Sequence, residues 1–246
     1  MKFLAFPLVI LCLSLDACSS EFGDAGDLGQ LDVITPRFAA AISSQPAEAR
    51  DCSLVLYGDS ILNGAYVEQD RFRRHARNPA AEIEARRPAW TVDDRTQPGQ
   101  SLAKLARTFR NDARNARVVV IGSGIAEGWA GETVLRNLPW MVYTVRGEGR
   151  IPVLTGYSRQ LPSAFMSPEK LAGRDRVDHE VEELAGDMKV EFADIGAAAP
   201  VSLADEVHPT ADYSLRLTDR LVAALDRVAP ECSRASAKTS AADAAG

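Results

Sequence analysis

Short apolar runs alternate with longer segments of mixed polarity along the middle of the chain. Runs of this kind favour strands that are buried on both faces of a sheet. The strands predicted in this way span residues 53–57, 90–92, 117–121, 151–155 and 189–195. Helical patterns are predicted over residues 65–87, 102–111, 131–146, 168–187 and 211–228, with Pro139 as a kink in the third of them.

This alternation predicts an α/β fold. Parallel strands need long crossover connections, so five strand and helix units indicate a three-layer αβα sandwich with a parallel sheet of about five strands. Ligands bind to such sheets beyond the carboxyl ends of the strands. The residues that follow predicted strands are Ser60, Gly99, Gly122, Tyr157 and Asp205. We expect them to meet at one edge of the sheet.

The first residues have the pattern of a secretion signal. Met1 and Lys2 precede an uncharged stretch to Leu15, which is too short to span a bilayer. The predicted organisation is a signal peptide over residues 1–17, a linker over 18–48, a domain over 49–232 and a disordered tail over 233–246. The residues before Cys18 are similar to a bacterial lipoprotein cleavage box, so Cys18 is a candidate membrane anchor; ordinary cleavage nearby is the alternative.

The four cysteines differ in their expected fates. Cys12 lies in the predicted signal peptide and Cys18 at its cleavage site, which leaves Cys52 and Cys232 in a compartment that permits disulfides. Cys52 enters the first strand at its amino end, and the last helix runs back toward that same edge of the sheet. We therefore predict a disulfide between Cys52 and Cys232.

Composition narrows the classes of partner. The chain has 246 residues, 46% of them hydrophobic, which is enough for a substantial core. The formal net charge of −6 and the lack of any lysine or arginine run argue against a nucleic-acid partner. The three histidines have no helical ligand spacing, so no metal site is expected.

The chemistry of the predicted sheet edge centres on Ser60. A serine hydroxyl becomes an effective nucleophile when an imidazole accepts its proton, and an acidic partner orients that imidazole. Asp205 precedes His208 by three residues in a loop, a spacing that allows the carboxylate to reach the ring. His75 and His179 lie among charged residues and are expected on the surface. The alternative role for Ser60 is to cap the helix that follows it.

The motifs Gly58-Asp59-Ser60 and Asp205-x-x-His208-Pro209 resemble the first and last sequence blocks of the SGNH or GDSL hydrolases. The resemblance covers residues 54–225 and implies a flavodoxin-like fold. It also implies that Ser60 is the nucleophile, His208 the general base and Asp205 the residue that orients it.

The resemblance also implies an oxyanion hole, with one departure from the family pattern. The expected donors are the backbone N–H groups of Ser60 and Gly99 and an asparagine side chain after the third strand. Gly124 stands where that asparagine is expected. The candidate substitutes are the backbone N–H of Gly124 or Ile125, the Ser123 hydroxyl and the Asn63 amide, and the sequence does not choose among them.

Two further residues, Asn63 and Tyr157, are candidates for substrate binding. A nucleotide site at the glycine-rich loop 122–128 is disfavoured, because its glycines do not have the dinucleotide-binding spacing.

These features together predict a monomeric, exported serine esterase of a bacterial periplasm or cell envelope. It needs no cofactor and acts on short acyl esters, acetyl esters above all, of a small molecule or a carbohydrate. The alternatives are an acyltransferase that uses the same three residues and a catalytically silent module that binds carbohydrates or esters.

Overall fold

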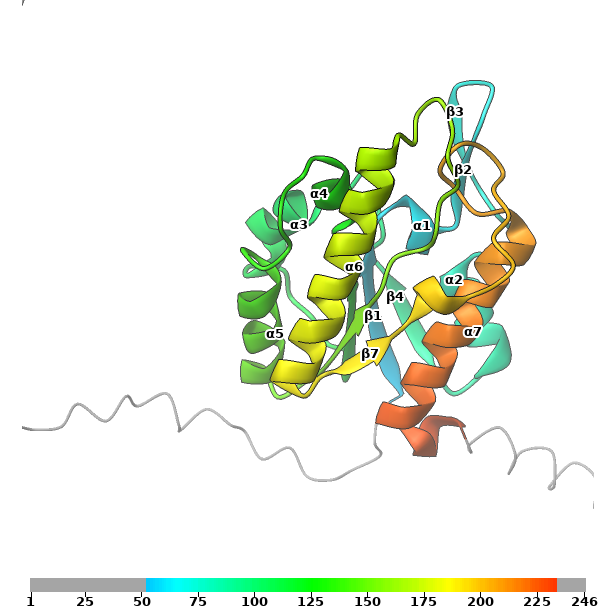
Figure 1. Cartoon of the computed structure of the whole chain (residues 1–246). Helices are drawn as coiled ribbons and strands as arrows, with labels where there is room; N and C mark the ends of the chain where they lie inside the picture. The colour runs from blue at the N-terminus through cyan, green and yellow to red at the C-terminus, as the bar shows by residue number, and fades with distance from the viewer. Residues whose placement is uncertain (1–51, 234–246) are drawn as a thin grey trace, which may run out of the picture. The chain divides into compact units, whose positions relative to one another are not determined.

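A computed structural model describes residues 52–233 of the chain, which contain a five-stranded parallel sheet (Figure 1). The order of the strands across the sheet is β4-β1-β5-β6-β7, and all four neighbouring pairs are parallel. The strands are β1 (Ser53–Gly58), β4 (Thr91–Asp94), β5 (Val118–Gly122), β6 (Ile151–Thr155) and β7 (Glu191–Ala193). All five predicted strands are confirmed, although the last is shorter than expected.

Helices cover both faces of this sheet and complete the predicted three layers (Figure 1). One face carries α2 (Pro79–Arg86) and α7 (Ala211–Val228), and the other carries α3 (Leu102–Phe109), α5 (Leu138–Gly147) and α6 (Pro168–Met188). Alternate residues of β1 explain the two cores, since Leu54 and Leu56 pack under α7 whereas Val55 and Tyr57 pack under α3 and α5. A strand buried on both faces therefore needs the continuous apolar run found in the sequence.

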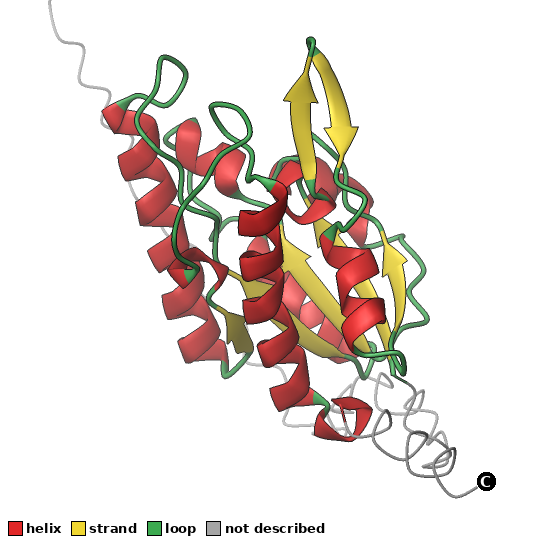
Figure 2. Cartoon of the chain, turned by 90° about the vertical axis from the view of Figure 1, so that its right-hand side faces the viewer, coloured by secondary structure: helices red, strands yellow, loops and turns green. Residues whose placement is uncertain are grey.

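The segment over residues 65–87 differs from its prediction. Only α2 is helical, and the preceding residues form a hairpin of β2 (Ala65–Glu68) and β3 (Arg71–Arg74). The two-residue turn uses Gln69 and Asp70, both with positive φ, which matches the twist of paired strands. The hairpin extends beyond the carboxyl edge of the main sheet (Figure 2).

The helix predicted over residues 131–146 is shorter than expected and is not kinked. It begins only at Leu138, and Pro139 lies in its first turn, where its missing N–H costs nothing. A separate short helix, α4 (Ile125–Trp129), forms within the glycine-rich loop that follows β5. Helices α6 and α7 match their predicted positions to within a residue.

The predicted signal peptide, the linker with Cys18, and all but the first residue of the predicted tail lie outside the described residues. Within residues 52–233, no helix is long and apolar enough to cross a membrane.

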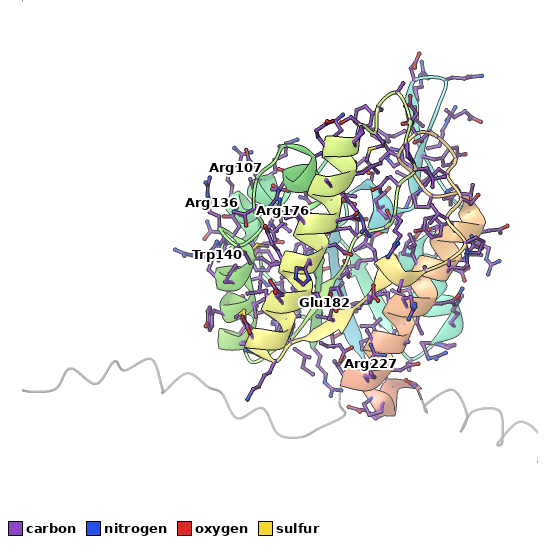
Figure 3. All side chains as sticks on the ribbon, in the orientation of Figure 1. Arg107, Arg136, Trp140, Arg176, Glu182 and Arg227 are labelled. Atoms are coloured by element: carbon purple, nitrogen blue, oxygen red, sulfur yellow. A yellow bond between two sulfur atoms is a disulfide. The ribbon has the colours of Figure 1, made fainter. Side chains whose placement is uncertain are left out.

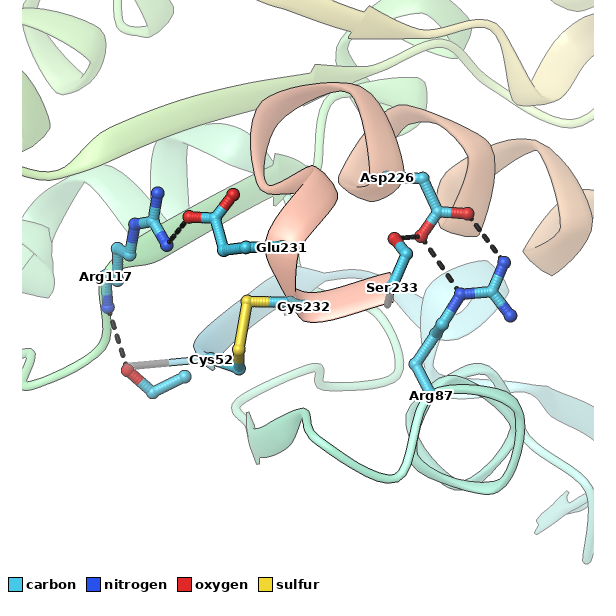
Figure 4. The surroundings of a disulfide bond; sticks show 8 residues. Cys52, Arg87, Arg117, Asp226, Glu231, Cys232 and Ser233 are labelled. Atoms are coloured by element: carbon cyan, nitrogen blue, oxygen red, sulfur yellow. Dashed lines mark hydrogen bonds and ion pairs between the residues drawn. A yellow bond between two sulfur atoms is a disulfide. The ribbon is translucent and has the colours of Figure 1, made fainter. Parts of the chain in front are cut away.

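The predicted disulfide between Cys52 and Cys232 is present, with the two Cα atoms 5.7 Å apart (Figure 4). It joins the amino end of β1 to the short helical turn after α7. The polar contacts near it include the ion pair of Arg117 with Glu231 and the hydrogen bond that Ser233 donates to Asp226 (Figure 4).

Removal of this disulfide is expected to lower stability considerably, because the bridge closes a chain segment of 180 residues. The entropy lost by an unfolded chain grows with the size of the closed loop, so we expect a loss of about 2–5 kcal/mol. The double variant Cys52→Ser/Cys232→Ser avoids free thiols, and urea unfolding measures the effect. An unchanged unfolding free energy would show that the bridge does not constrain the unfolded chain.

Candidate active site

Ser60 lies at the turn between β1 and the short helix α1 (Ser60–Asn63). Asp59 caps this helix by accepting the Ile61 N–H at 2.9 Å, and Gly64 ends it with a φ of 71°. Gly58 lets the turn pack tightly, because a Cβ at this position would lie 2.6 Å from the side chain of Leu62. The serine is thus held at the carboxyl end of a central strand.

Asp205 and His208 lie on the loop before α7, and this loop folds back on itself. The Ala204 N–H donates to the His208 carbonyl at 2.8 Å, and Leu203 pairs with Pro209 in an isolated β-bridge. The turn brings the Asp205 carboxylate to within 2.8 Å of His208 Nδ1. His208 Nε2 lies 3.0 Å from Ser60 Oγ, so the three predicted residues form one hydrogen-bonded chain.

Backbone groups on both sides orient the Asp205 carboxylate. One oxygen accepts the N–H groups of Val207 and His208, and the other accepts the Val67 N–H from the hairpin at 2.7 Å. Burial by itself raises the pKa of Asp205, but these N–H donors and the His208 ring outweigh it and hold the pKa below its usual value. The carboxylate therefore stays ionised beside the imidazole at neutral pH.

The other predicted site residues include Asn63, a candidate for substrate binding, and Gly99, a candidate oxyanion donor. The Asn63 amide donates to the Thr96 hydroxyl at 3.0 Å and is almost fully buried, so it is engaged within the fold and not presented to a ligand. Gly99 lies in an exposed turn after β4 with a φ of 71°. This turn follows β4, the strand next to β1, and the role of Gly99 as an oxyanion donor stays a prediction.

Gly124, at the sequence position where an asparagine was expected, packs against Tyr157. A Cβ on Gly124 would lie 2.0 Å from the Tyr157 hydroxyl, and the φ of Gly124 is +146°. The tyrosine is buried and its hydroxyl donates to the Ser123 carbonyl at 3.2 Å. Tyr157 was expected to contact substrate, but its hydroxyl instead fills the space that a side chain at position 124 would take.

Replacing Gly124 by Ala is expected to destabilise the fold by about 2–4 kcal/mol, from overpacking and backbone strain together. Tyr157→Phe removes the hydroxyl that the new methyl group would strike, so the double variant should lose less than the sum of the single losses. Unfolding free energies of all three variants measure this coupling. Gly149→Ala is the matched control, because its φ is +73° and no atom lies within 4 Å of its Cβ position. Full additivity would contradict the proposed clash.

A second carboxylate, that of Asp59, is buried next to Ser60. Asp59 is 4% exposed, and its pKa is raised to about 7, chiefly by burial; the Ile61 N–H opposes this shift and the charge of Glu127 adds to it. Glu127 is also buried: its Oε1 accepts the Ala103 N–H at 2.9 Å, while its Oε2 has no partner within residues 52–233. The same two carboxylates, after burial, keep the pKa of Tyr157 well above its usual value.

The raised pKa of Asp59 predicts how stability changes with pH. Between pH 4 and pH 7 the folded protein keeps a proton on Asp59 that the unfolded chain has lost, so stability falls as the pH rises through this range. Asp59→Asn keeps a side-chain oxygen for the cap and removes the charge. Unfolding free energies measured from pH 4 to 8 should therefore show a smaller decline in the variant. Parallel curves for the two proteins would refute this assignment.

The hairpin contributes residues that the sequence analysis did not place at the site. Apart from the Val67 N–H, Phe72 lies edge-on to the His208 ring with centroids 5.7 Å apart. His75, which was expected on the surface, is partly exposed; it stacks on Tyr66, and its Nε2 contacts the Pro209 carbonyl. The available signal was the β-branched and aromatic residues Tyr66, Val67 and Phe72, which favour strands, but the charged residues among them led to the prediction of a helix.

His179 is exposed on α6, as predicted, with its ring beside Glu183. Within residues 52–233, no group of three or more histidine, cysteine and acidic side chains is arranged to hold a metal ion.

A cavity of about 350 Å³ lies apart from Ser60, Asp205 and His208. Its walls come from α3, α4, α6 and the segment between α4 and α5, and include Glu127, Arg136 and Arg176. Figure 3 shows Arg136 and Arg176 on the side of the molecule that carries α3 and α5. Neither Ser60 nor His208 lines this cavity, and Ser60 is partly exposed.

The fold is that of the GDSL or SGNH hydrolases, and solved structures of such enzymes are similar to this chain over most of their length. A lipolytic G-D-S-L family protein from Veillonella parvula is 14% identical with a TM-score of 0.55, over 69% of this chain and 96% of that one. A carbohydrate acetylesterase from Sinorhizobium meliloti is 16% identical with a TM-score of 0.59, over 72% and 98%. An acetylxylan esterase from Geobacillus stearothermophilus is 16% identical with a TM-score of 0.54, over 70% and 93%. No family model and no curated protein matches the sequence.

Proposed function

We propose that this protein is a serine esterase that hydrolyses short acyl esters through Ser60, His208 and Asp205. One observation carries the proposal: the hydrogen-bonded chain from Ser60 Oγ to His208 Nε2 at 3.0 Å, and from His208 Nδ1 to Asp205 at 2.8 Å. A serine, an imidazole and a carboxylate in this order are the arrangement that activates a hydroxyl for acyl transfer.

The proposed reaction has two halves. His208 Nε2 accepts the Ser60 proton as the hydroxyl attacks the ester carbonyl, and then donates that proton to the leaving alcohol, which gives an acyl-serine and a free alcohol. A water molecule enters and attacks the acyl-serine while His208 accepts its proton; His208 then donates that proton to Ser60 Oγ as the acid leaves, which restores the serine and the neutral imidazole. Asp205 stabilises the imidazolium in both halves by accepting the hydrogen bond of Nδ1–H.

The oxyanion would be stabilised by backbone N–H groups of Ser60, Gly99 and Gly124. One hydrogen bond supports the role of the Gly124 N–H. Tyr157 holds the Ser123 carbonyl, and because a trans peptide is planar, the Gly124 N–H points the opposite way from that carbonyl. An oxyanion donor contributes about 10²–10³ in rate, so the missing asparagine makes such a substitute valuable.

Acetyl esters of carbohydrates are the proposed substrates. Two of the similar solved structures are described as a carbohydrate acetylesterase and an acetylxylan esterase, which supports this class. The cavity of about 350 Å³ is not lined by Ser60 and is not part of this proposal.

A silent binding module is the less favoured alternative, because binding alone gives no reason to keep three hydrogen-bonded residues in this order. An acyltransferase would use the same residues, and no contact of the described residues favours it.

We also propose that the protein is exported and acts as a monomer. The disulfide supports export, since disulfides persist in oxidising compartments. Attachment to a membrane through a lipid on Cys18 remains a prediction from the sequence.

The proposed activity is tested with p-nitrophenyl acetate and an acetylated xylooligosaccharide. Ser60→Ala and His208→Ala should each lower kcat by about 10⁴-fold or more, and Asp205→Asn by about 10²–10⁴-fold. His179→Ala is the matched control and should retain full activity, because this histidine is exposed on α6. Equal rates in the wild type and the Ser60 variant, with folding confirmed by circular dichroism, would rule out the serine mechanism.

A further inference from the structure

The β2–β3 hairpin is attached to both halves of the proposed active site. On the side of Asp205, the Val67 N–H donates to the carboxylate at 2.7 Å, and His75 contacts the Pro209 carbonyl at 3.0 Å. On the side of the serine turn, Arg74 Nε donates to the Asn63 carbonyl at 2.7 Å. The hairpin therefore has a fixed position beyond the carboxyl edge of the sheet, although most of it stands clear of the main sheet (Figures 1 and 2).

The hairpin presents one apolar cross-strand pair. Val67 and Phe72 lie directly opposite each other, so their side chains share one face of the ribbon. Phe72 is 55% exposed, yet its ring lies edge-on to the His208 imidazole at 5.7 Å between centroids. An exposed aromatic ring thus adjoins the group that transfers the proton.

The position of Phe72 relative to His208 indicates which part of an ester it would meet. The proposed mechanism requires Nε2 of His208 to donate a proton to the leaving alcohol, so the alcohol part must lie on the imidazole side of Ser60. The carbonyl oxygen of the ester then faces the oxyanion donors.

We propose that Phe72 determines specificity by contacting the alcohol part of the ester and favouring one with a flat, apolar ring face, either an aryl ring or the ring of a sugar. Aromatic side chains prefer such faces because the contact buries apolar area without a polar group to desolvate. The inference rests on the proposed esterase function and extends it from the reaction to the choice of alcohol.

Phe165 provides a contrast on the other side of the Asp205 loop. Its N–H donates to Glu206 at 2.6 Å, but its exposed ring already lies edge-on to Trp129 and beneath the Lys170 ammonium. It makes no ring contact with His208. Phe165→Ala is therefore the nearby control for loss of an exposed phenylalanine, and Tyr143→Ala, on α5, is the distant one.

The test compares acetate esters that differ only in their alcohol. The three substrates are phenyl acetate, a methyl xyloside acetate and ethyl acetate, and kcat/KM is measured for the wild type, Phe72→Ala and Phe72→Tyr. Phe72→Ala should lower kcat/KM for phenyl acetate and for the methyl xyloside acetate by about 3- to 10-fold, the size of one aromatic contact. For ethyl acetate, kcat/KM should change less than twofold. Phe72→Tyr should keep the preference, and both control variants should leave it unchanged. If kcat/KM falls for only one of these two esters, Phe72 contacts the kind of ring that this ester carries.

An equal loss on all three esters would overturn the inference, since it would show that Phe72 only supports the orientation of His208. Unchanged rates on all three would overturn it as well.

A binding measurement separates this inference from the proposed function. In the Ser60→Ala background the esters are not consumed, and NMR titration gives Kd for phenyl acetate and ethyl acetate. Adding Phe72→Ala should weaken phenyl acetate binding by the same 3- to 10-fold and leave ethyl acetate unchanged. If the wild type hydrolyses no ester but Phe72→Ala still weakens the binding of phenyl acetate alone, the proposed esterase function is wrong and the contact of Phe72 with the ring is supported. If hydrolysis depends on Ser60 but the contrast is absent, only the inference about Phe72 fails.

Discussion

The hydrogen bond between Ser60 Oγ and His208 Nε2 joins residues 148 positions apart in the sequence, and much of the fold keeps these two groups in register. β1 fixes the serine, because it is the second strand of the sheet and is buried on both faces. The imidazole depends on a loop that closes on itself before α7. A bond of 3.0 Å tolerates little error in either element, so the packing of α7 against the sheet bears directly on the chemistry.

The surroundings of the serine turn combine polar groups in a way that costs stability. Asp59 and Glu127 are both nearly buried, and they lie close enough for the charge of one to raise the pKa of the other. Burying two carboxylates together is unfavourable unless one keeps a proton. Asp59 takes that proton near neutral pH, and its oxygen still caps the short helix that carries the serine. Local instability at this turn accompanies the exposure of a reactive hydroxyl.

The sequence predicted the strands and the three proposed catalytic residues, but not the hairpin or the role of Tyr157. The buried strands were predictable because parallel strands covered on both faces require unbroken apolar runs, as in Val118 to Ile121. Asp205, His208 and Ser60 were found because their spacing and their positions after strands have a chemical reason. The hairpin was missed because its pairing depends on positive φ at Gln69 and Asp70, which neither residue type requires. The role of Tyr157 was also out of reach, because its contact with position 124 joins segments that follow different strands.

The disulfide has a consequence for how the domain is presented. Cys52 and Cys232, near the two limits of the described chain, have Cα atoms 5.7 Å apart at the amino edge of the sheet, whereas Ser60 follows β1 at the carboxyl edge. Both ends of the domain therefore leave from the pole opposite the nucleophile. The same closeness of the ends makes the domain suited to circular permutation, with a short linker in place of the bridge and new termini in an exposed turn such as that after α5.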